Sequence, residues 1–337
     1  MQAFVTGGSG FLGGRLIAEL VKRGHKVHAL ARSEKAVRAV EALGARAVRG
    51  DLDDPKALEA GARGAQLVYH CAALAEEWGP WEDFLAANVQ GTRNVARAAR
   101  AAGARLLHVS TEAILAGRPM VRVDEAVPPP ARALGHYAES KRQAEEVIHR
   151  GLGEGLDAVI VRPRFIWGLG DTSLLPKLVA KVKSGQFAWL GGGLHLTSSC
   201  HVANCIEGML VAAERGKKGE VYYLTDGPPR PMKELLGGIL SAAGAPPGER
   251  VLPLWAARIL AAVGESLWRV LRLRGAPPLT RMALKLVGEE VTVVDSKARR
   301  ELGYTPRVTV EEGLRELAEA AQGCAKAAPS GSSTSGP

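Results

Sequence analysis

In the first half of the chain, short apolar segments alternate with longer amphipathic ones. The apolar segments lie near residues 2–6, 26–31, 45–48, 67–70, 104–109 and 157–162. They are continuous rather than alternating, which is typical of strands buried on both faces of a parallel sheet. Between them, apolar residues recur at helical spacing near residues 11–23, 33–43, 82–102 and 136–152. This order predicts a doubly wound α/β domain whose ligand crevice lies beyond the carboxyl ends of the strands.

The pattern changes after Pro163, where glycine and proline become frequent. Residues 202–215 and 220–225 predict one further helix and strand that return to the sheet. The rest of the second half predicts a smaller, mainly helical lobe for the substrate, followed by a tail rich in Ala, Ser, Gly and Pro. The expected boundaries are 1–163 and 198–225 for the first domain, 164–197 and 226–322 for the substrate lobe, and 323–337 for a disordered tail.

A glycine-rich turn joins the first strand to the first helix. Gly7, Gly10 and Gly13 have G-x-x-G-x-x-G spacing. Glycine permits positive φ and a close approach of backbone N–H groups to a pyrophosphate, and the helix N-terminus adds partial positive charge. Such turns also occur as plain connections, but a second strand within about 30 residues completes a βαβ unit typical of dinucleotide binding. We expect Phe11 and Leu12, which open the helix, to contact the cofactor as well.

The end of the second strand bears on which dinucleotide binds. NAD-specific sites place a carboxylate there for the ribose 2′-hydroxyl. Here the strand ends at Ala31 and is followed by Arg32, Ser33 and, nearby, Lys35. An arginine fork suits a 2′-phosphate, and no carboxylate repels it. We therefore expect NADP, with NAD as the alternative if Arg32 stacks on the adenine and both cofactors bind.

Tyr137 and Lys141 form a Y-x-x-x-K pair at the head of a predicted helix, where i, i+4 spacing places both on one face. A free tyrosine has a pKa of about 10, and an ammonium nearby lowers it by about 1–3 units. Tyr137 would then exchange a proton with a substrate while Lys141 holds the nicotinamide ribose. Ser110 and Thr111, at the end of the preceding strand, offer a hydroxyl for the substrate oxygen. For an isolated pair, packing and local turn bonds would be the simpler interpretation.

Together these motifs resemble the extended short-chain dehydrogenase/reductase family, the NAD(P)-dependent epimerase/dehydratase superfamily. The resemblance covers residue 1 to about 320 and implies a Rossmann sheet and a catalytic trio of Thr111, Tyr137 and Lys141. Many members carry two adjacent hydroxyls at the first position, but the second falls on Glu112, so Ser110 also remains a candidate. The supporting segments are the glycine turn, Asp51-Leu52, His70-Cys71-Ala72-Ala73, Asn88 to Asn94, Tyr137/Lys141, and Arg162 to Gly168.

The resemblance also implies roles around the cofactor. Asp51 and Leu52 would flank the adenine, and Asn88 would brace the sheet near the site. The residues expected to line the rest of the cofactor, in addition to those above, are Cys71, Ala72, Ala73 and Pro163.

The substrate class is suggested by what one segment lacks. Sugar-nucleotide epimerases carry an arginine for the diphosphate before the late helix, whereas residues 194–204 contain neither Arg nor Lys. Residues 277–281 and 293–299 look more like the 3β-hydroxysteroid and sterol dehydrogenase branch and related reductases of long-chain β-keto acids. The resemblance thus implies an enzyme that transfers a hydride between NAD(P) and a secondary alcohol or ketone of an apolar substrate. The alternatives are a sugar-nucleotide epimerase or dehydratase that holds NAD tightly, and a non-enzymatic NADP-sensing module.

Two groups of aromatic residues bear on an apolar substrate. Trp78 and Trp81 follow the fourth strand, where the site should open, and with Phe165 they would line the substrate pocket or pack as core. Residues 252–274 form a basic amphipathic helix with tryptophans. Such a helix lies on a membrane surface, covers an apolar pocket or packs on the core.

The charge and the cysteine content limit the classes of binding partner that we expect. The 337 residues carry 44 basic and 35 acidic side chains, a net charge of +9, and the basic residues are scattered through the helices. We expect a solvated basic surface and no nucleic-acid partner. The four cysteines form no C-x-x-C pair and show no metal-ligand spacing, so we expect no metal and a cytoplasmic protein. No signal peptide and no membrane-spanning run are evident; family analogy suggests a homodimer through helices 82–102 and 136–152.

Overall fold

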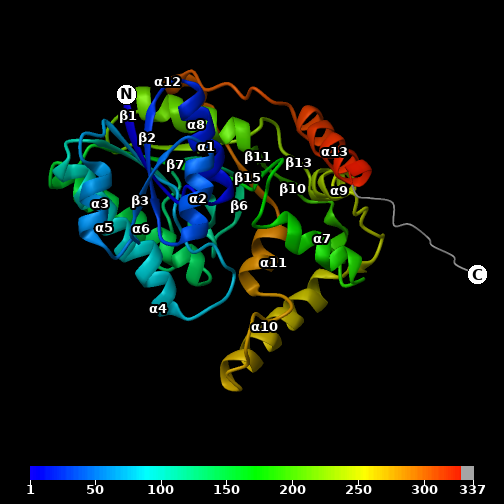
Figure 1. Cartoon of the computed structure of the whole chain (residues 1–337). Coiled ribbons are helices and arrows are strands. Elements are labelled where there is room, and N and C mark those ends of the chain that lie inside the picture. The colour runs from blue at the N-terminus through cyan, green and yellow to red at the C-terminus, as the bar shows by residue number, and fades with distance from the viewer. Residues whose placement is uncertain (328–337) are drawn as a thin grey trace, which may run out of the picture.

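A seven-stranded parallel sheet forms the centre of the protein (Figure 1). The computed structural model describes residues 1–327 of the chain. The strand order is β12-β7-β5-β4-β1-β2-β3, which confirms the predicted doubly wound sheet. The strands are β1 (Gln2–Thr6), β2 (Lys26–Ala31), β3 (Arg46–Arg49), β4 (Leu67–His70), β5 (Arg105–Val109), β7 (Ala158–Pro163) and β12 (Val221–Leu224).

Helices cover both faces of this sheet (Figure 1). Successive residues of one strand point to opposite layers: Val159 packs with one core cluster and Ile160 with the other. This is why the strands are apolar at consecutive positions. One layer contains α1 (Phe11–Lys22), α2 (Glu34–Ala42) and α8 (Val202–Arg215), and the other contains α3 (Pro55–Ala62), α5 (Gly91–Ala101) and α6 (His136–Gly153).

The sequence located the strands of this sheet to within one residue, but it misjudged the helix expected at 82–102. That segment is divided into α4 (Trp81–Phe84), a π-helical segment η1 (Leu85–Gln90) and α5. A single π turn keeps nearly the same apolar spacing as an α-helix, so periodicity does not detect it. The short helix α3 was not predicted.

The lobe is mainly helical, as the sequence predicted, but it also contains short strands that the sequence did not predict. Its strands are only two to four residues long and are too short to produce a recognisable pattern. Four of these strands form one sheet: β6 (Met120–Val123), β10 (Leu196–Thr197), β13 (Arg230–Pro231) and β15 (Val291–Val293). The others form two pairs, β8 (Ile166–Trp167) with β11 (Cys200–His201) and β9 (Trp189–Leu190) with β14 (Val251–Leu252).

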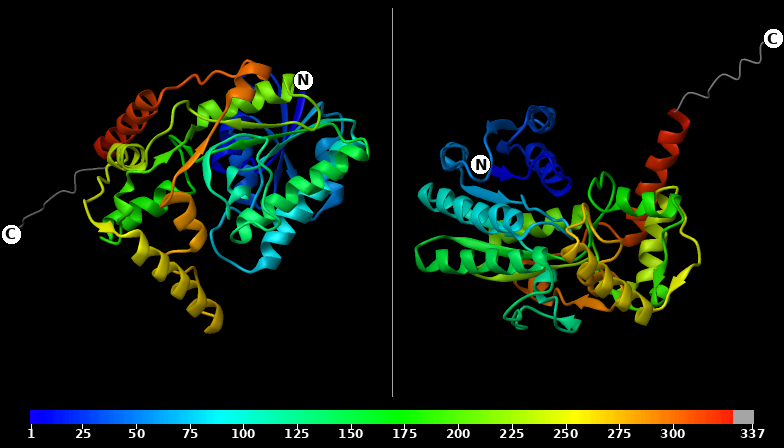
Figure 2. Two further views of the ribbon diagram at one scale, coloured as in Figure 1. Left: turned by 180° about the vertical axis from the view of Figure 1, so that it is seen from behind. Right: turned by 90° about the horizontal axis from the view of Figure 1, so that it is seen from below.

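The helices of the lobe surround these strands, and α10 projects away from the body (Figures 1 and 2). They are α7 (Leu175–Lys183), α9 (Met232–Ala242), α10 (Leu254–Val270), α11 (Arg281–Val287) and α13 (Val310–Ala327), with the short η3 (Gly191–Gly193). The short helix α12 (Ser296–Leu302) packs with α8 in the layer of the main sheet, and η2 (Glu112–Leu115) follows β5. A tail was expected from residue 323, but α13 continues to Ala327; the rest of that tail, residues 328–337, lies outside the described residues. Within residues 1–327, no helix is long and apolar enough to cross a membrane.

Candidate active site

The glycine turn lies where the strand order reverses, between β1 and β4. Gly7 has φ +77°, and a Cβ on it would lie 2.6 Å from the backbone nitrogen of Ala72. A Cβ on Gly13 would lie 2.2 Å from the carbonyl oxygen of Gly7. Only glycine therefore allows the first turn of α1 and the end of β4 to approach so closely.

The N-terminus of α1 offers free donors to this crevice. Gly10 is the N-cap residue and contributes no capping side chain, and the first turn contains no acidic residue. The first N–H groups of a helix have no partner within the helix. Those of Phe11 and Leu12 are therefore suited to a phosphate, so the residues present fit a dinucleotide.

The end of β2 presents a cation. The Arg32 side chain is 76% exposed, and its guanidinium lies 3.8 Å from the Asp51 carboxylate. The Ser33 hydroxyl accepts a 3.2 Å hydrogen bond from the N–H of Ala36 and so caps α2. Ser33 therefore uses its oxygen locally, whereas the guanidinium of Arg32 is exposed beside Asp51. Lys35 is exposed in the first turn of α2.

A buried histidine joins the ends of the two central strands. The Thr92 hydroxyl donates to the carbonyl oxygen of Asn88 at 2.6 Å, so it accepts from Nε2 of His70 at 2.9 Å. Nδ1 of His70 then accepts from the hydroxyl of Thr6 at 2.7 Å. Burial, helped by the charge of Lys141, lowers the pKa of His70 to about 3. A neutral His70 is thus held by hydrogen bonds from both ring nitrogens at the base of the crevice.

Asn88 connects the loop after β4 to α6. Its amide oxygen accepts from the N–H of Leu74 at 2.7 Å, and its amide nitrogen donates to the carbonyl of Leu74 at 3.0 Å. The same nitrogen donates to the hydroxyl of Ser140 at 2.8 Å, which in turn donates to the carbonyl of Tyr137. The π-helical turn that carries Asn88 therefore fixes the helix that carries Tyr137 and Lys141; π turns are common at functional sites.

Tyr137 lies in the first turn of α6, beside Thr111. It packs on a buried cluster that contains Met282 of α11, and Leu286 of the same helix packs on this cluster too. Burial raises the pKa of the phenol, the charge of Glu112 raises it further, and the nearby Thr111 hydroxyl opposes this shift. Among the two hydroxyls that the sequence left open, Thr111 is therefore the one beside Tyr137. The hydroxyl of Ser110 is buried and has no hydrogen-bond partner in the part of the chain that the structure describes.

Lys141 does not act on Tyr137 as the sequence predicted. Its ammonium donates to the carbonyl oxygen of Val109 at 2.7 Å and lies 3.3 Å from Nε2 of His108. Burial lowers the pKa of Lys141 to about 8. The expected depression of the Tyr137 pKa is wrong for this structure, because burial of the phenol outweighs the attraction of a cation that is hydrogen-bonded elsewhere.

The sequence reasoning missed a buried ion pair beside this phenol. Glu112 lies 3.2 Å from the guanidinium of Arg164, and both side chains are 4% exposed. Arg162 pairs in the same way with Glu145 at 2.6 Å. Two arginines around the end of an apolar strand could have revealed these pairs, because a buried guanidinium needs an acidic partner. No sequence pattern indicated that His108 lies within hydrogen-bond distance of the Lys141 ammonium.

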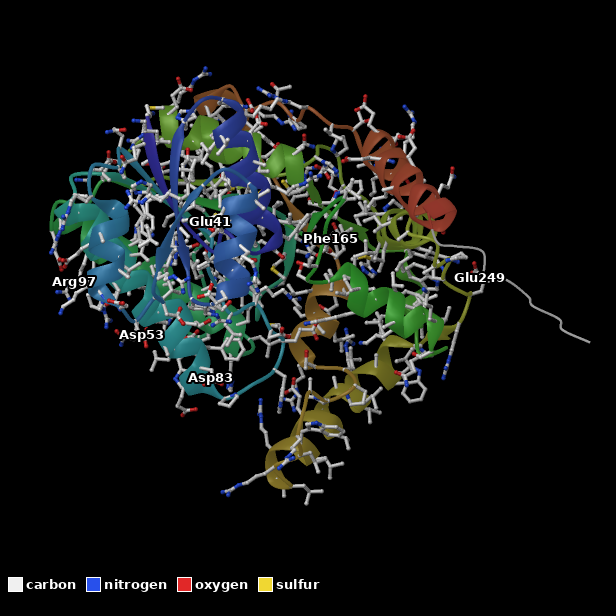
Figure 3. The ribbon with its side chains drawn as sticks, in the orientation of Figure 1. Glu41, Asp53, Asp83, Arg97, Phe165 and Glu249 are labelled. Carbon is white, nitrogen blue, oxygen red and sulfur yellow. The ribbon has the colours of Figure 1, made fainter. Side chains whose placement is uncertain are left out.

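The aromatic residues proposed for the pocket are not all in one place. Arg269 of α10 stacks on the ring of Trp78, with 5.4 Å to the ring centroid. Trp81 packs edge-on against His136, the residue before Tyr137, with 5.6 Å between ring centroids. Phe165 lies at the junction between the sheet and the lobe (Figure 3), and it packs with lobe core residues. In the described residues, no group of three or more His, Cys, Asp and Glu side chains is arranged to hold a metal ion.

Comparison with known proteins identifies similar chains along almost the whole length. The model of the NAD dependent epimerase/dehydratase family matches residues 3–224. The chain is 48% identical over 322 residues to the 4-hydroxy-2-methyl-3-oxo-4-farnesyl-3,4-dihydroquinoline-1-oxide ketoreductase of Stigmatella aurantiaca, covering 95% of this chain and 96% of that protein. It is 37% identical to the 2-alkyl-3-oxoalkanoate reductase of Stenotrophomonas maltophilia, covering 94% and 98% of the two chains.

More distant similarities point to the same group of folds. The chain is 30% identical to the sterol-4-alpha-carboxylate 3-dehydrogenase of Dictyostelium discoideum, covering 94% of this chain and 99% of that protein. Among solved structures, gox2253 superimposes with a TM-score of 0.77 at 31% identity, covering 96% and 98% of the two chains.

Proposed function

Because the chain belongs to the NAD dependent epimerase/dehydratase family, we propose that it is an NAD(P)-dependent oxidoreductase that reduces a ketone of an apolar substrate. The observation that carries this proposal is the position of Tyr137, whose phenol lies beside Thr111 and on the apolar cluster that contains Met282 of α11. A protonated phenol beside a ketone can donate the proton that the carbonyl oxygen needs when the carbonyl carbon accepts a hydride.

Each part of the site has a defined task in this proposal. A nicotinamide cofactor would, when bound, supply the hydride. Tyr137 donates its proton to the carbonyl oxygen, and Thr111 orients the reacting groups. Lys141 holds the nicotinamide ribose from its place against Val109. The glycine turn and the N-terminus of α1 hold the pyrophosphate. Asp51 and Leu52 flank the adenine, and Cys71, Ala72, Ala73 and Pro163 line the cofactor.

The proposed substrate class is a 2-alkyl-3-oxoalkanoate or a quinolone-type ketone, with sterols as a more distant choice. The two relatives at 48% and 37% identity are named as reductases of such ketones, and the sterol dehydrogenase is less similar. Residues 194–204, which include β10, β11 and the start of α8, contain neither Arg nor Lys for a sugar diphosphate. Trp78, Trp81 and Phe165 remain proposed pocket residues, and the contact between Trp78 and Arg269 places α10 beside the loop after β4.

A screen of cofactor oxidation tests this function against its rival. Ketone-dependent oxidation of free NADPH or NADH, with no turnover of UDP-sugars, supports the reductase. Tightly bound NAD that co-purifies and supports conversion of a UDP-sugar, with no net change in free cofactor, would instead support an epimerase or dehydratase. A protein that binds NADP and converts neither class of substrate would support the sensing module.

We propose NADP as the preferred cofactor. The exposed Arg32 has a planar fork for a 2′-phosphate, and the β2 end carries no carboxylate of its own. Asp51, 3.8 Å from Arg32, is the group that a 2′-phosphate would displace from this arginine. The ratio of kcat/KM for NADPH and NADH measures the preference.

We propose that α10 rests on an anionic membrane surface from which the apolar substrate enters. Trp255, Ile259, Val263 and Leu267 follow one another at i, i+4 spacing and are 44–67% exposed. The acidic residue of this helix, Glu265, is buried and accepts from the N–H of Arg281. The outward-facing charges near the stripe are therefore basic, which suits anionic headgroups.

The remaining proposals concern assembly and location. A homodimer through α5 and α6 rests on resemblance alone, and Arg93, Arg97, Arg100 and Arg150 line the hollow between these helices. Such a dimer would bring like charges together, so we expect it to strengthen at high salt, as light scattering would show.

The cysteines at 71, 200 and 205 are free thiols, which supports a cytoplasmic location. The domain boundaries given by the sequence also remain proposals.

A further inference from the structure

A hollow of about 390 Å³ lies between α5 and α6, outside the candidate active site. Figure 3 shows Arg97, one of its residues, on the outer side of the sheet domain and far from Phe165 at the junction with the lobe. The buried side chains of Ala96, Val147 and Leu156 line it. The exposed residues that line it are Arg93, Arg97, Arg100, Arg150 and Glu154. Ligand pockets usually measure about 300–1,000 Å³, so this hollow, which we call the arginine hollow, can hold a small molecule.

The charge of the arginine hollow is unbalanced. Four guanidinium groups and one carboxylate line it, so its net charge is +3. The carboxylate of Glu154 pairs with Arg100. Within residues 1–327, no ion pair joins Arg93, Arg97 or Arg150 to a carboxylate. Like charges at i, i+4 spacing, such as those of Arg93 and Arg97, destabilise a helix. An anion in the hollow would offset this repulsion.

The four arginines are arranged on two helices that border the hollow. Arg93, Arg97 and Arg100 follow one another at i, i+4 and i+7 on α5, so they share one face and extend over about 10 Å. Arg150 lies in the last turn of α6, on the other side. The guanidinium group is a planar fork that binds two oxygens of a phosphate at once, and it is less strongly hydrated than an ammonium. An anion with several phosphate groups could therefore contact both helices.

We propose that the arginine hollow binds an anion with several phosphate groups, either an inorganic polyphosphate or the polyphosphate chain of a nucleotide. The volume of the hollow favours such a small anion over an acidic helix of another protein, because a helix with its side chains is about 10–12 Å across. The site is compatible with the homodimer proposed through the same helices, since an anion would offset the repulsion between two sets of arginines. A solvated basic surface without a specific ligand is the competing explanation.

Calorimetric titration of the whole protein with inorganic tripolyphosphate at low salt tests the inference. Arg97→Gln combined with Arg150→Gln should weaken binding by at least about tenfold. Arg46→Gln combined with Arg118→Gln removes the same charge from two exposed positions outside the hollow and should leave the affinity unchanged. The dinucleotide site is common to both double variants, so the difference between them reports the hollow. Arg97→Lys, which keeps the charge and loses the fork, should weaken binding less than the double variant.

Titration with ATP distinguishes the two sources of phosphate. Tighter binding of ATP than of tripolyphosphate, with the same dependence on Arg97 and Arg150, would assign the hollow to a nucleotide, and equal affinities would assign it to the polyphosphate chain itself. No binding of tripolyphosphate by the wild type, or equal affinities in the two double variants, would overturn the inference and leave a solvated basic surface. Binding of polyglutamate without binding of tripolyphosphate would also overturn it, in favour of an acidic protein. None of these results depends on ketone reduction, so the inference and the proposed function can fail separately.

Discussion

The ammonium of Lys141 donates a 2.7 Å hydrogen bond to the carbonyl oxygen of Val109, the last residue of β5. This contact joins α6 to the carboxyl end of the sheet. Lys141 is 2% exposed, and Nε2 of His108 accepts on another side. Burial lowers the pKa of His108 well below its ordinary value, so the imidazole is a neutral acceptor. The lysine is thus fixed within the floor of the crevice before any ligand binds.

This buried ammonium makes stability depend on pH. The pKa of Lys141 is lowered from 10.5 to about 8 on folding, so between these values the unfolded chain binds more protons than the folded one. Stability therefore rises with pH across this window, and the penalty is fully present below pH 8. Relative to Lys141→Met, the free energy of unfolding of the wild type should rise by about 3 kcal/mol from pH 8 to 10.5. Urea denaturation at several pH values measures it, and a constant difference would contradict the burial of a charge.

Gly7 and Gly24 provide a matched pair for the cofactor cradle. Both have φ +77°, but a Cβ on Gly7 meets Ala72 at 2.6 Å, whereas a Cβ on Gly24 meets nothing within 4 Å. Alanine at either position should cost about 1 kcal/mol of stability through backbone strain, and Gly7→Ala should cost more because its Cβ meets the backbone of Ala72. Only Gly7→Ala should also weaken NADPH binding, by at least about tenfold, because the turn must move. Titration with NADPH, followed by fluorescence, measures the affinity of each variant. Equal affinities of Gly7→Ala and Gly24→Ala for NADPH would contradict a role of the glycine turn in cofactor binding.

Arg32 should determine the choice between the two cofactors. Removing a charge-assisted hydrogen bond to phosphate costs about 1.5–3 kcal/mol, or roughly tenfold to a hundredfold. Arg32→Ala should therefore lower kcat/KM for NADPH by that factor and leave NADH almost unchanged. Arg46→Ala, at the start of β3 and away from the ligand end, is the control. A wild type that prefers NADH, or an unchanged preference in Arg32→Ala, would disprove the assignment.

The exposed stripe of α10 should bind vesicles. We expect the wild type to sediment with vesicles of phosphatidylglycerol and phosphatidylcholine, and less with phosphatidylcholine alone or at high salt. Ile259→Ser combined with Val263→Ser should weaken binding by roughly tenfold or more. Val121→Ser, an equally exposed residue of β6, should have no effect. No binding by the wild type, together with a dimer that the double variant abolishes, would assign this face to a second copy of the chain.

The sequence predicted the parallel sheet well because its strands are buried on both faces and are apolar throughout, as Val159 and Ile160 illustrate. It also located the close approach at Gly7, since glycine spacing directly reflects a backbone constraint. Both features depend on local residue chemistry. The strands of the lobe do not depend on local residue chemistry in this way. They are two or three residues long, and their conformation is set by the neighbouring strands in space.

Side-chain partners were the least predictable part. Tyr137 and Lys141 both lie on α6, as the helical pattern predicted. The i, i+4 spacing could not show that Val109 and His108 hold the ammonium. The ion pair between Glu112 and Arg164 joins residues far apart in the chain. The pKa of a buried group depends on burial and on partners that lie far away in the chain. For this reason the sequence predicted a lowered pKa for Tyr137, whereas burial in the structure raises it.

Ketone-dependent oxidation of NADPH by the wild type and by Tyr137→Phe tests the central claim most directly. The wild type should oxidise NADPH with a 2-alkyl-3-oxoalkanoate, and Tyr137→Phe should lose at least about a hundredfold in kcat while binding NADPH normally. Tyr222→Phe, which removes a phenol hydroxyl from the edge strand β12, should retain full activity. Equal ketone reduction by the wild type and Tyr137→Phe would contradict the account, because the proton would then come from another group.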